Sequence, residues 1–210
     1  MRRAWTWLCL AFIGSSVACG PPRVQLDEPA RNYEPGDYRS ILRKWTRDSQ
    51  LNSLTAMDNV LTVTSTYHSA DFRRAYVARY AEDYRLTTDD EKALTDRSRA
   101  EAGELEHFYV ALYAQNAKYN DLKLEDPAWV VRLVDDTETE TPPLEIQPIK
   151  RPGAIERTYF PYTSPWRVAY RISFPRRTTS GRPAIRKGAA WFGLRFAGPQ
   201  GQTTLVWQTG

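Results

Sequence analysis

Residues 166–174, WRVAYRISF, are the stretch of the sequence that decides the fold class. Every second side chain from Trp166 to Phe174 is apolar, whereas Arg167 and Arg171 fall between them. Side chains point alternately to the two faces of a strand, so this order separates an apolar face from a basic one. Antiparallel sheets commonly have one packed and one solvated face. The stretch therefore predicts an antiparallel strand that packs on a core.

The same two-residue period recurs along the chain after Gly103, and Pro, Gly and polar turns separate the segments. A β-branched run at 59–67 indicates an earlier strand. We therefore expect an α+β fold that is mainly β, namely an antiparallel, immunoglobulin-like β-sandwich of about seven strands. The further expected strands are at 105–114, 129–134, 144–149, 190–196 and 203–208.

Parts of the chain before Gly103 have apolar residues at the spacing of a helix, every three to four positions. Apolar residues from Tyr38 to Trp45 lie at i, i+3, i+4 and i+7, which predicts a short N-terminal helix. Aromatic residues recur every four positions from Phe72 to Tyr84, which indicates a second helix, and a capping-box pattern at 88–91 opens a third. The last two helices predict a helical insertion at about 70–102, after the first strand.

The N-terminus has the pattern of an export signal. Two arginines precede an apolar run from Ala4 to Ile13, and small residues follow up to Ala18. This order is typical of a secretory signal peptide. The apolar run is also shorter than the roughly 18 residues of a membrane-spanning helix. We expect residues 1–18 to be a signal peptide that is removed and takes no part in the fold.

The segment from Val17 to Gly20 resembles a bacterial lipobox around Cys19, with Ser16 where that motif usually has Leu. The resemblance implies a thioether-linked diacylglycerol on Cys19, cleavage before it and acylation of the new amino terminus. Several acyl chains anchor a protein far more firmly than one. The alternative is ordinary cleavage near Ala18, which would leave a lone thiol in an oxidising compartment.

Two regions are expected after the signal peptide. Residues 19–36 contain four prolines and little apolar periodicity, so we expect the lipidated cysteine followed by an extended tether. Residues 37–210 are expected to form a single globular domain. Cys9 lies in the signal peptide, so the mature chain could form no internal disulfide and must be held together by packing.

Five short motifs are distributed over the chain, namely Phe108-x-Val110-x-Leu112-Tyr113, Asn120-Asp121-Leu122, Trp129-x-Val131-x-Leu133, Phe160-Pro161-Tyr162 and Leu205-Val206-Trp207. The chain looks like a group of uncharacterised bacterial envelope lipoproteins from about residue 38 onward, and that group has no assigned activity. The resemblance implies an envelope location. Gly20 after the cysteine favours the outer membrane, because Asp there signals inner-membrane retention in some bacteria.

The charge is concentrated at the C-terminal end. Residues 151–210 contain 10 Lys and Arg against one acidic residue, a net charge of +9. We expect a basic surface that docks on an envelope protein or an anionic envelope polymer, since nucleic acid is a poor partner for an exported protein. The alternative is a solvated loop that protects a sheet edge. The surface would comprise Arg167, Arg171, Arg176, Arg177, Arg182, Arg186 and Lys187.

The sequence contains no familiar catalytic or metal-binding motif, so we expect no catalytic residue, no cofactor and no metal. His68 and His107 are its two histidines, and capping or surface roles are favoured over a shared metal site with Asp71 or Glu104. The acidic turn at 135–140 is interpreted as a solvated hairpin in preference to a calcium site.

Trp191 is expected on the outward face of its strand, where it could stack on a sugar ring or anchor an interface. The alternative is that it packs under a neighbouring loop. With these features, the sequence predicts a lipid-anchored cell-envelope protein that acts as a binding or assembly module and is not an enzyme. The alternatives are an envelope hydrolase with dispersed carboxylates and a purely structural lipoprotein.

Overall fold

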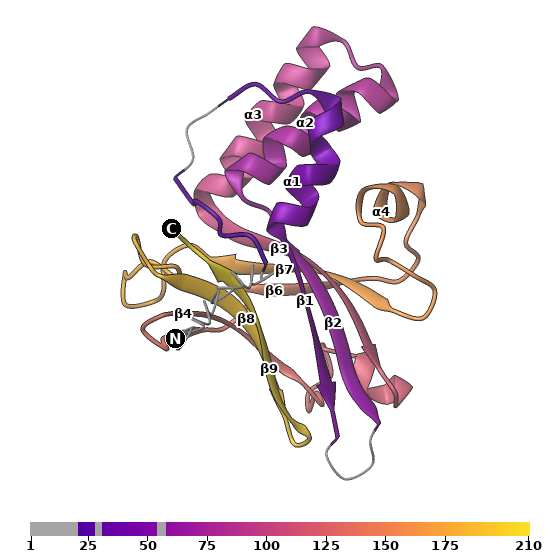
Figure 1. The fold of residues 1–210 in the computed structure, drawn as a ribbon, viewed down its shortest axis with the longest axis vertical. Coiled ribbons are helices and arrows are strands. Elements are labelled where there is room, and N and C mark those ends of the chain that lie inside the picture. The colour runs from indigo at the N-terminus through magenta and orange to yellow at the C-terminus, as the bar shows by residue number, and fades with distance from the viewer. Residues whose placement is uncertain (1–20, 28–30, 54–57) are drawn as a thin grey trace, which may run out of the picture.

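The computed structural model describes residues 21–27, 31–53 and 58–210. Within these ranges the chain forms two antiparallel sheets and is mainly β (Figure 1). One sheet has five strands in the order β1-β2-β3-β7-β6, and the other has four in the order β5-β4-β8-β9. The strands are β1 Thr46–Asn52, β2 Asn59–Tyr67, β3 Leu105–Ala114, β4 Val130–Asp135, β5 Glu140–Thr141, β6 Glu145–Ile149, β7 Val168–Pro175, β8 Trp191–Gly198 and β9 Gly201–Gln208.

The helices lie outside the two sheets. The first three gather at one end of the molecule, and the fourth lies beside the five-stranded sheet (Figure 1). None of the helices in the described part of the chain is both long and apolar enough to cross a membrane. They are α1 Tyr38–Trp45, α2 Ala70–Tyr84, α3 Thr88–Glu104 and α4 Ala154–Tyr159, with short 3-10 turns at Pro35–Asp37 and Ala117–Asn120.

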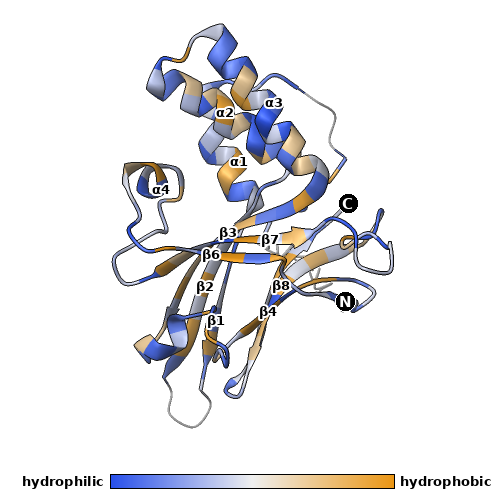
Figure 2. Ribbon diagram, turned by 180° about the vertical axis from the view of Figure 1, so that it is seen from behind, coloured by the Kyte–Doolittle hydropathy of each residue, from blue (hydrophilic) through white to orange (hydrophobic). Residues whose placement is uncertain are grey.

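Aromatic residues dominate the core between the sheets. The indoles of Trp45, Trp129 and Trp207 are almost fully buried. Trp207 Nε1 donates to the Trp45 carbonyl at 2.9 Å, which ties β9 to the end of α1. Phe192 stacks on the Trp207 ring with a centroid distance of 5.4 Å. Orange and blue alternate along several strands in Figure 2, as expected where one face meets this core.

The central strand β3 is buried on both faces. Val110 faces the core, whereas Tyr109 points to the opposite face and is equally inaccessible. The Phe160 ring, which follows α4, stacks on Tyr109 with a centroid distance of 3.8 Å. The segment around α4 therefore covers part of the outer face of the five-stranded sheet.

The predicted class, an α+β sandwich that is mainly β, is confirmed, but its details differ. The described residues contain nine strands where about seven were expected, in sheets of five and four strands. Strand β1 was missed because its residues are mostly polar, and it pairs along its length with β2. The helical insertion therefore follows the second strand of the chain and not the first.

Two local expectations were also wrong. Trp166 lies outside β7, which begins at Val168, and its side chain is 80% exposed. The expected tether contains a docked segment, because Val24 is fully buried and its N–H donates to the Gln208 carbonyl at 2.8 Å. Arg47 Nη2 also donates to the Pro22 carbonyl at 2.7 Å.

Side-chain caps fix the two long helices. Ser69 Oγ accepts from the Phe72 N–H at 3.0 Å and begins α2, and Thr87 Oγ1 accepts from the Asp90 N–H at 3.2 Å and begins α3. Such caps satisfy N–H groups that have no partner within the helix. Arg85 ends α2 in the left-handed conformation, at φ 52°, and turns the chain into α3.

Candidate functional site

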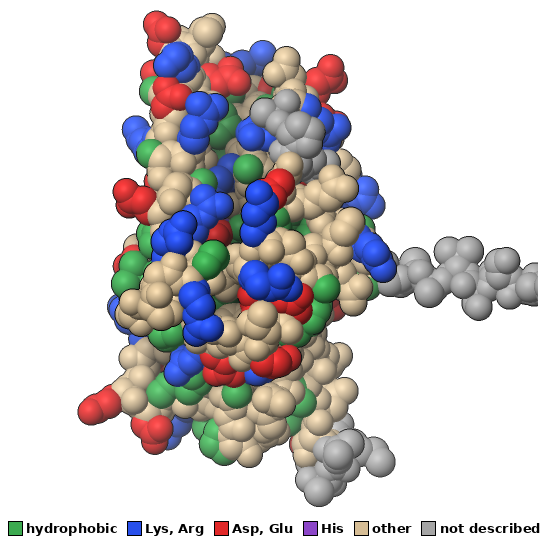
Figure 3. Space-filling view, turned by 90° about the vertical axis from the view of Figure 1, so that its left-hand side faces the viewer, with side chains coloured by type: hydrophobic (Ala, Val, Ile, Leu, Met, Phe, Trp, Pro, Cys, Tyr) green, Lys and Arg blue, Asp and Glu red, His purple; other side chains and the backbone are tan. Residues whose placement is uncertain are grey.

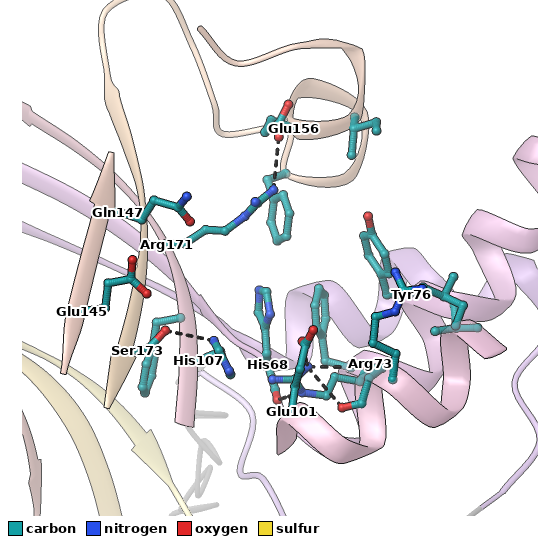
Figure 4. A pocket seen from close by; sticks show the side chains of 18 residues that line it. His68, Arg73, Tyr76, Glu101, His107, Glu145, Gln147, Glu156, Arg171 and Ser173 are labelled. Carbon is teal, nitrogen blue, oxygen red and sulfur yellow. Dashed lines mark hydrogen bonds and ion pairs between the residues drawn. The ribbon is translucent and has the colours of Figure 1, made fainter. Parts of the chain in front are cut away.

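A cavity of about 370 Å³ lies between the five-stranded sheet, the helices α2 and α3, and the α4 segment. Its volume is within the range of small-molecule binding sites. Figure 4 shows that the lining side chains come from all of these elements. The residues that matter most for its chemistry are His68, Arg73, Glu101, His107, Arg171 and Ser173.

The register of β2 on β3 brings the two histidines together. Tyr67 pairs with Phe108, and the next residue continues the pairing, because the His68 N–H donates to the His107 carbonyl at 2.9 Å. Both side chains line the cavity. The expectation of separate capping and surface roles was therefore wrong, and the missing information was the register across a helical insertion.

Each imidazole has a buried nitrogen without a hydrogen-bond partner among the described residues. His107 Nδ1 lies 3.1 Å from Ser173 Oγ, a hydrogen bond in either tautomer. The Nε2 atoms of His68 and His107 are both inaccessible to water and have no hydrogen-bond partner in the described structure. Buried polar atoms are rarely left unpaired, so such atoms require an explanation.

Arg73 on α2 adds a positive charge next to the histidines. Its Nε donates to the His68 carbonyl at 3.0 Å, and its Nη1 lies 3.6 Å from Glu101 Oε2 on α3. Its Nη2 is also buried without a hydrogen-bond partner among the described residues. Arg73 thus joins the end of β2, α2 and α3, and one of its donors remains unsatisfied.

Both histidines are held in the neutral form near pH 7. Burial lowers the pKa of His68 well below its usual value of 6.5, and the positive charge of Arg73 lowers it further. Burial likewise lowers the pKa of His107, together with Arg73, although Glu101 opposes the change. A protonated imidazole here would need a negative partner.

Aromatic rings form the apolar wall. The His68 ring lies parallel to Phe160, with an interplanar angle of 6°, and its centroid is 4.9 Å from that of Phe72. Tyr76 continues this wall along α2, 6.1 Å from Phe72. The aromatic spacing that predicted α2 thus also supplies part of the cavity.

Arg171 and Glu156 lie on the side of the cavity opposite His68 (Figure 4). Arg171 Nη2 lies 3.3 Å from Glu156 Oε1. Glu156 Oε2 accepts from the Gly153 N–H at 2.8 Å, so this carboxylate also caps α4. Glu145 on the edge strand β6 lines the cavity as well and is exposed.

The predicted basic surface is divided by ion pairs. Arg171 belongs to the cavity, Arg176 is paired with Glu106 at 3.1 Å, and Arg186 with Asp136 at 2.7 Å. Blue basic side chains are interrupted by red acidic ones on the face shown in Figure 3. Three of the seven predicted residues, Arg171, Arg176 and Arg186, are therefore next to an acidic side chain that reduces their positive charge. Of the other members, Arg167 donates to Thr64 Oγ1, Arg177 to the Gly181 carbonyl and Arg182 to Ser180 Oγ, and Lys187 is exposed.

Acidic residues of the turn at 135–140 form ion pairs with arginine side chains. Arg195 lies 2.6 Å from Glu138 and 2.9 Å from Glu140. Hydrogen bonds from the Ala190 N–H and from Arg186 lower the pKa of Asp136. The described residues include no group of three or more His, Cys, Asp or Glu side chains placed to hold a metal ion.

Of the remaining predicted sites, Trp191 is only half-buried, at the start of β8. The more exposed tryptophan is Trp166, which sequence alternation had assigned to the core face. Cys19, the predicted lipidation site, lies outside the described residues.

Comparisons with known proteins add little. No protein-family model matches the chain, and no curated protein matches it. A crystal structure of a protein of unknown function from Burkholderia pseudomallei K96243 is similar over 81% of both chains, with 12% sequence identity and a TM-score of 0.41. A similarity this weak supports no argument about the chain.

Proposed function

We propose that this chain is a lipid-anchored protein of the bacterial cell envelope, a binding module rather than an enzyme, and that it binds a small ligand in the cavity between its sheet and its helices.

The proposal is carried by one observation: three buried nitrogen atoms without hydrogen-bond partners in the described structure belong to residues that line the same cavity. They are Nε2 of His68, Nε2 of His107 and Nη2 of Arg73. A buried polar atom left unpaired costs about 1–3 kcal/mol, so a ligand gains binding free energy when the side chains turn and expose these atoms to it. An apolar cavity wall with a few convergent polar groups is typical of a small-molecule site.

The envelope location is supported by the sequence of the N-terminus, and the docked segment adds a geometric consequence. The buried Val24 is the fifth residue after Cys19, and an extended chain spans at most about 3.6 Å per residue. A lipid on Cys19 would therefore hold the domain within about 20 Å of the bilayer surface. The domain would lie close to the headgroups, with little freedom to move away from them.

A hydrolase is the second candidate, and a specific observation favours it. Ser173 Oγ and His107 Nδ1 are within hydrogen-bond distance, as in a nucleophile and its base. Ser173, however, lies within β7, between β3 and β6, where the backbone groups of the strand serve the sheet. An oxyanion needs N–H donors directed at it, and a mid-strand position supplies them poorly. The geometry therefore favours binding over hydrolysis.

Membrane anchoring is tested by acyl labelling and membrane fractionation of the wild type and of Cys19→Ala. We expect label on the wild type alone, and release of the variant from the membrane fraction. An unlabelled wild type, or a variant that remains as firmly bound, contradicts the anchor.

Ligand binding is tested by native mass spectrometry of protein purified from envelope extracts. Leu94→Trp places a large side chain in the cavity lining, whereas Ala93→Trp places the same ring on the exposed neighbouring position of α3. We expect a small molecule bound to the wild type and to Ala93→Trp and absent from Leu94→Trp. The absence of a bound molecule from all three, which a purely structural lipoprotein predicts, contradicts the proposal, as does equal retention by all three.

A further inference from the structure

The pair formed by Arg73 and Glu101 indicates which chemical group the cavity accepts. Arg73 is 9% exposed, and its guanidinium lies beside a carboxylate supplied by the protein itself. At 3.6 Å this contact is longer than a charge-assisted hydrogen bond, which is about 2.7–2.9 Å. Glu101 is therefore a loosely held anion at a buried cationic position.

Glu101 is also free to leave this position. Its side chain is 54% exposed, and none of the residues of α3 is buried. A helix with few buried contacts opens locally at low cost. By contrast, Arg73 is held by its bond to the His68 carbonyl and lies at 3.5 Å from Ser98. An incoming carboxylate could therefore displace Glu101 while Arg73 stays in place.

We propose that the cavity binds an organic carboxylate whose charged group takes the place of Glu101 beside Arg73. His68 and His107 line the same cavity, and their side chains turn on binding so that the Nε2 atoms form further hydrogen bonds to its oxygens. The inference rests on the proposed function, because it assigns a chemical class to the ligand of the same cavity.

The opposite part of the ligand is apolar. Phe72 and Phe160 lie 6.0 Å apart and share contacts with the His68 ring, and Tyr76 extends the same wall. Planar rings favour offset or edge contacts with other rings. A cavity of about 370 Å³ has room for a ligand with one or two rings, or a short aliphatic chain.

The other charges of the cavity are consistent with one anionic group. Arg171 and Glu156 neutralise each other at 3.3 Å. Arg97 and Glu145, both exposed, contribute one charge of each sign to the lining. Displacement of Glu101 therefore leaves Arg73 as the unbalanced charge among the lining residues.

Calorimetric titration of the purified protein, as processed in the cell, tests the inference with three probes of similar shape. These are 2-naphthoate, the neutral 2-naphthamide and the cationic 2-naphthylmethylamine. Hydrogen bonds to a charged group predict that the carboxylate binds at least about tenfold more tightly than the amide, and the amine more weakly still. Equal or tighter binding of the amide or the amine overturns the inference.

Two pairs of variants assign the effect to the residues. Arg73→Gln should weaken naphthoate binding about tenfold, whereas Arg74→Gln, which removes the same charge from the next residue of α2, should leave it unchanged. Glu101→Gln should strengthen binding, because the competing anion is removed, and Glu104→Gln in the same turn should not.

If Arg73→Gln fails to fold, the comparison of Glu101→Gln with Glu104→Gln still tests the inference. Glu101 is exposed, so its substitution should leave the fold intact. Weaker naphthoate binding by Glu101→Gln overturns the inference. If all three probes bind equally well and Leu94→Trp blocks them all, the carboxylate inference fails while the proposed binding function stands. If no probe binds, the inference fails, and the native mass spectrometry decides the proposed function separately.

Discussion

The carboxylate of Glu101 on α3 lies 3.6 Å from Nη1 of Arg73 on α2, at the edge of a cavity that also contains both histidines of the chain. This contact joins two helices of the insertion to the face of the five-stranded sheet. It also covers a buried guanidinium with an exposed side chain. This relationship suggests that the Glu101 carboxylate occupies the position beside Arg73 until the carboxylate of a ligand replaces it.

Binding of the carboxylate should depend on pH. Burial and the charge of Arg73 lower the pKa of both His68 and His107, so the free site holds neutral imidazoles near neutral pH. A bound carboxylate favours the protonated form and raises these pKa values. Affinity for 2-naphthoate should therefore rise as the pH falls from 7.5 to 5.5, by about threefold or more.

The control for this prediction is His107→Gln, which keeps a hydrogen-bonding side chain but does not titrate. It should flatten the pH dependence of binding in calorimetric titrations. The other ionisable side chains that face the cavity include His68, Glu101, Glu145 and Glu156. An equally steep profile in His107→Gln would contradict the role of the His107 imidazole in the pH dependence.

Two glycines should respond to alanine in opposite directions. A Cβ at Gly198 would lie 2.0 Å from the Ala128 carbonyl oxygen, so Gly198→Ala should lower the free energy of unfolding by about 2 kcal/mol or more. Gly103 is within α3, and a Cβ added there would meet no neighbouring part of the protein within 4 Å, so Gly103→Ala should raise it by about 0.5–1 kcal/mol. Urea unfolding measures the free energies of unfolding of the two variants. A Gly198→Ala protein as stable as the wild type would contradict the packing of β8.

The docked N-terminal segment can be released by one substitution. Val24→Asp buries an unpaired charge at a fully buried position, so the segment should detach from β9. Trypsin should then cleave after Arg23 about tenfold faster, measured by intact mass. Gln25→Asp adds the same charge at an exposed position and should have little effect. Equal cleavage rates in the two variants would show that residue 24 does not hold the segment.

Much of the fold could be predicted from local patterns. The alternation at 168–174 predicted β7, and the aromatic spacing from Phe72 to Tyr84 predicted α2. Strand β1 could not be predicted, because its polar sequence forms a strand only through its pairing with β2. The helix α4 was missed for a similar reason, since six residues after a Pro-Gly pair give too short a pattern.

The site was largely beyond prediction. His68 and His107 meet because β2 pairs with β3 across the whole helical insertion, and no local pattern specifies that register. The basic residues were visible in the sequence, but their acidic partners were not, because Asp136 and Glu106 are far from Arg186 and Arg176 along the chain. Charge counts predict a surface only when the partners of each charge are known.

The most direct test of the central claim is a crystal structure of the protein with 2-naphthoate bound. The account predicts the naphthoate carboxylate within hydrogen-bond distance of Arg73 and of a histidine Nε2, with the Glu101 side chain turned away. A naphthoate bound outside the cavity, or one bound inside it with Glu101 still beside Arg73, would contradict the account.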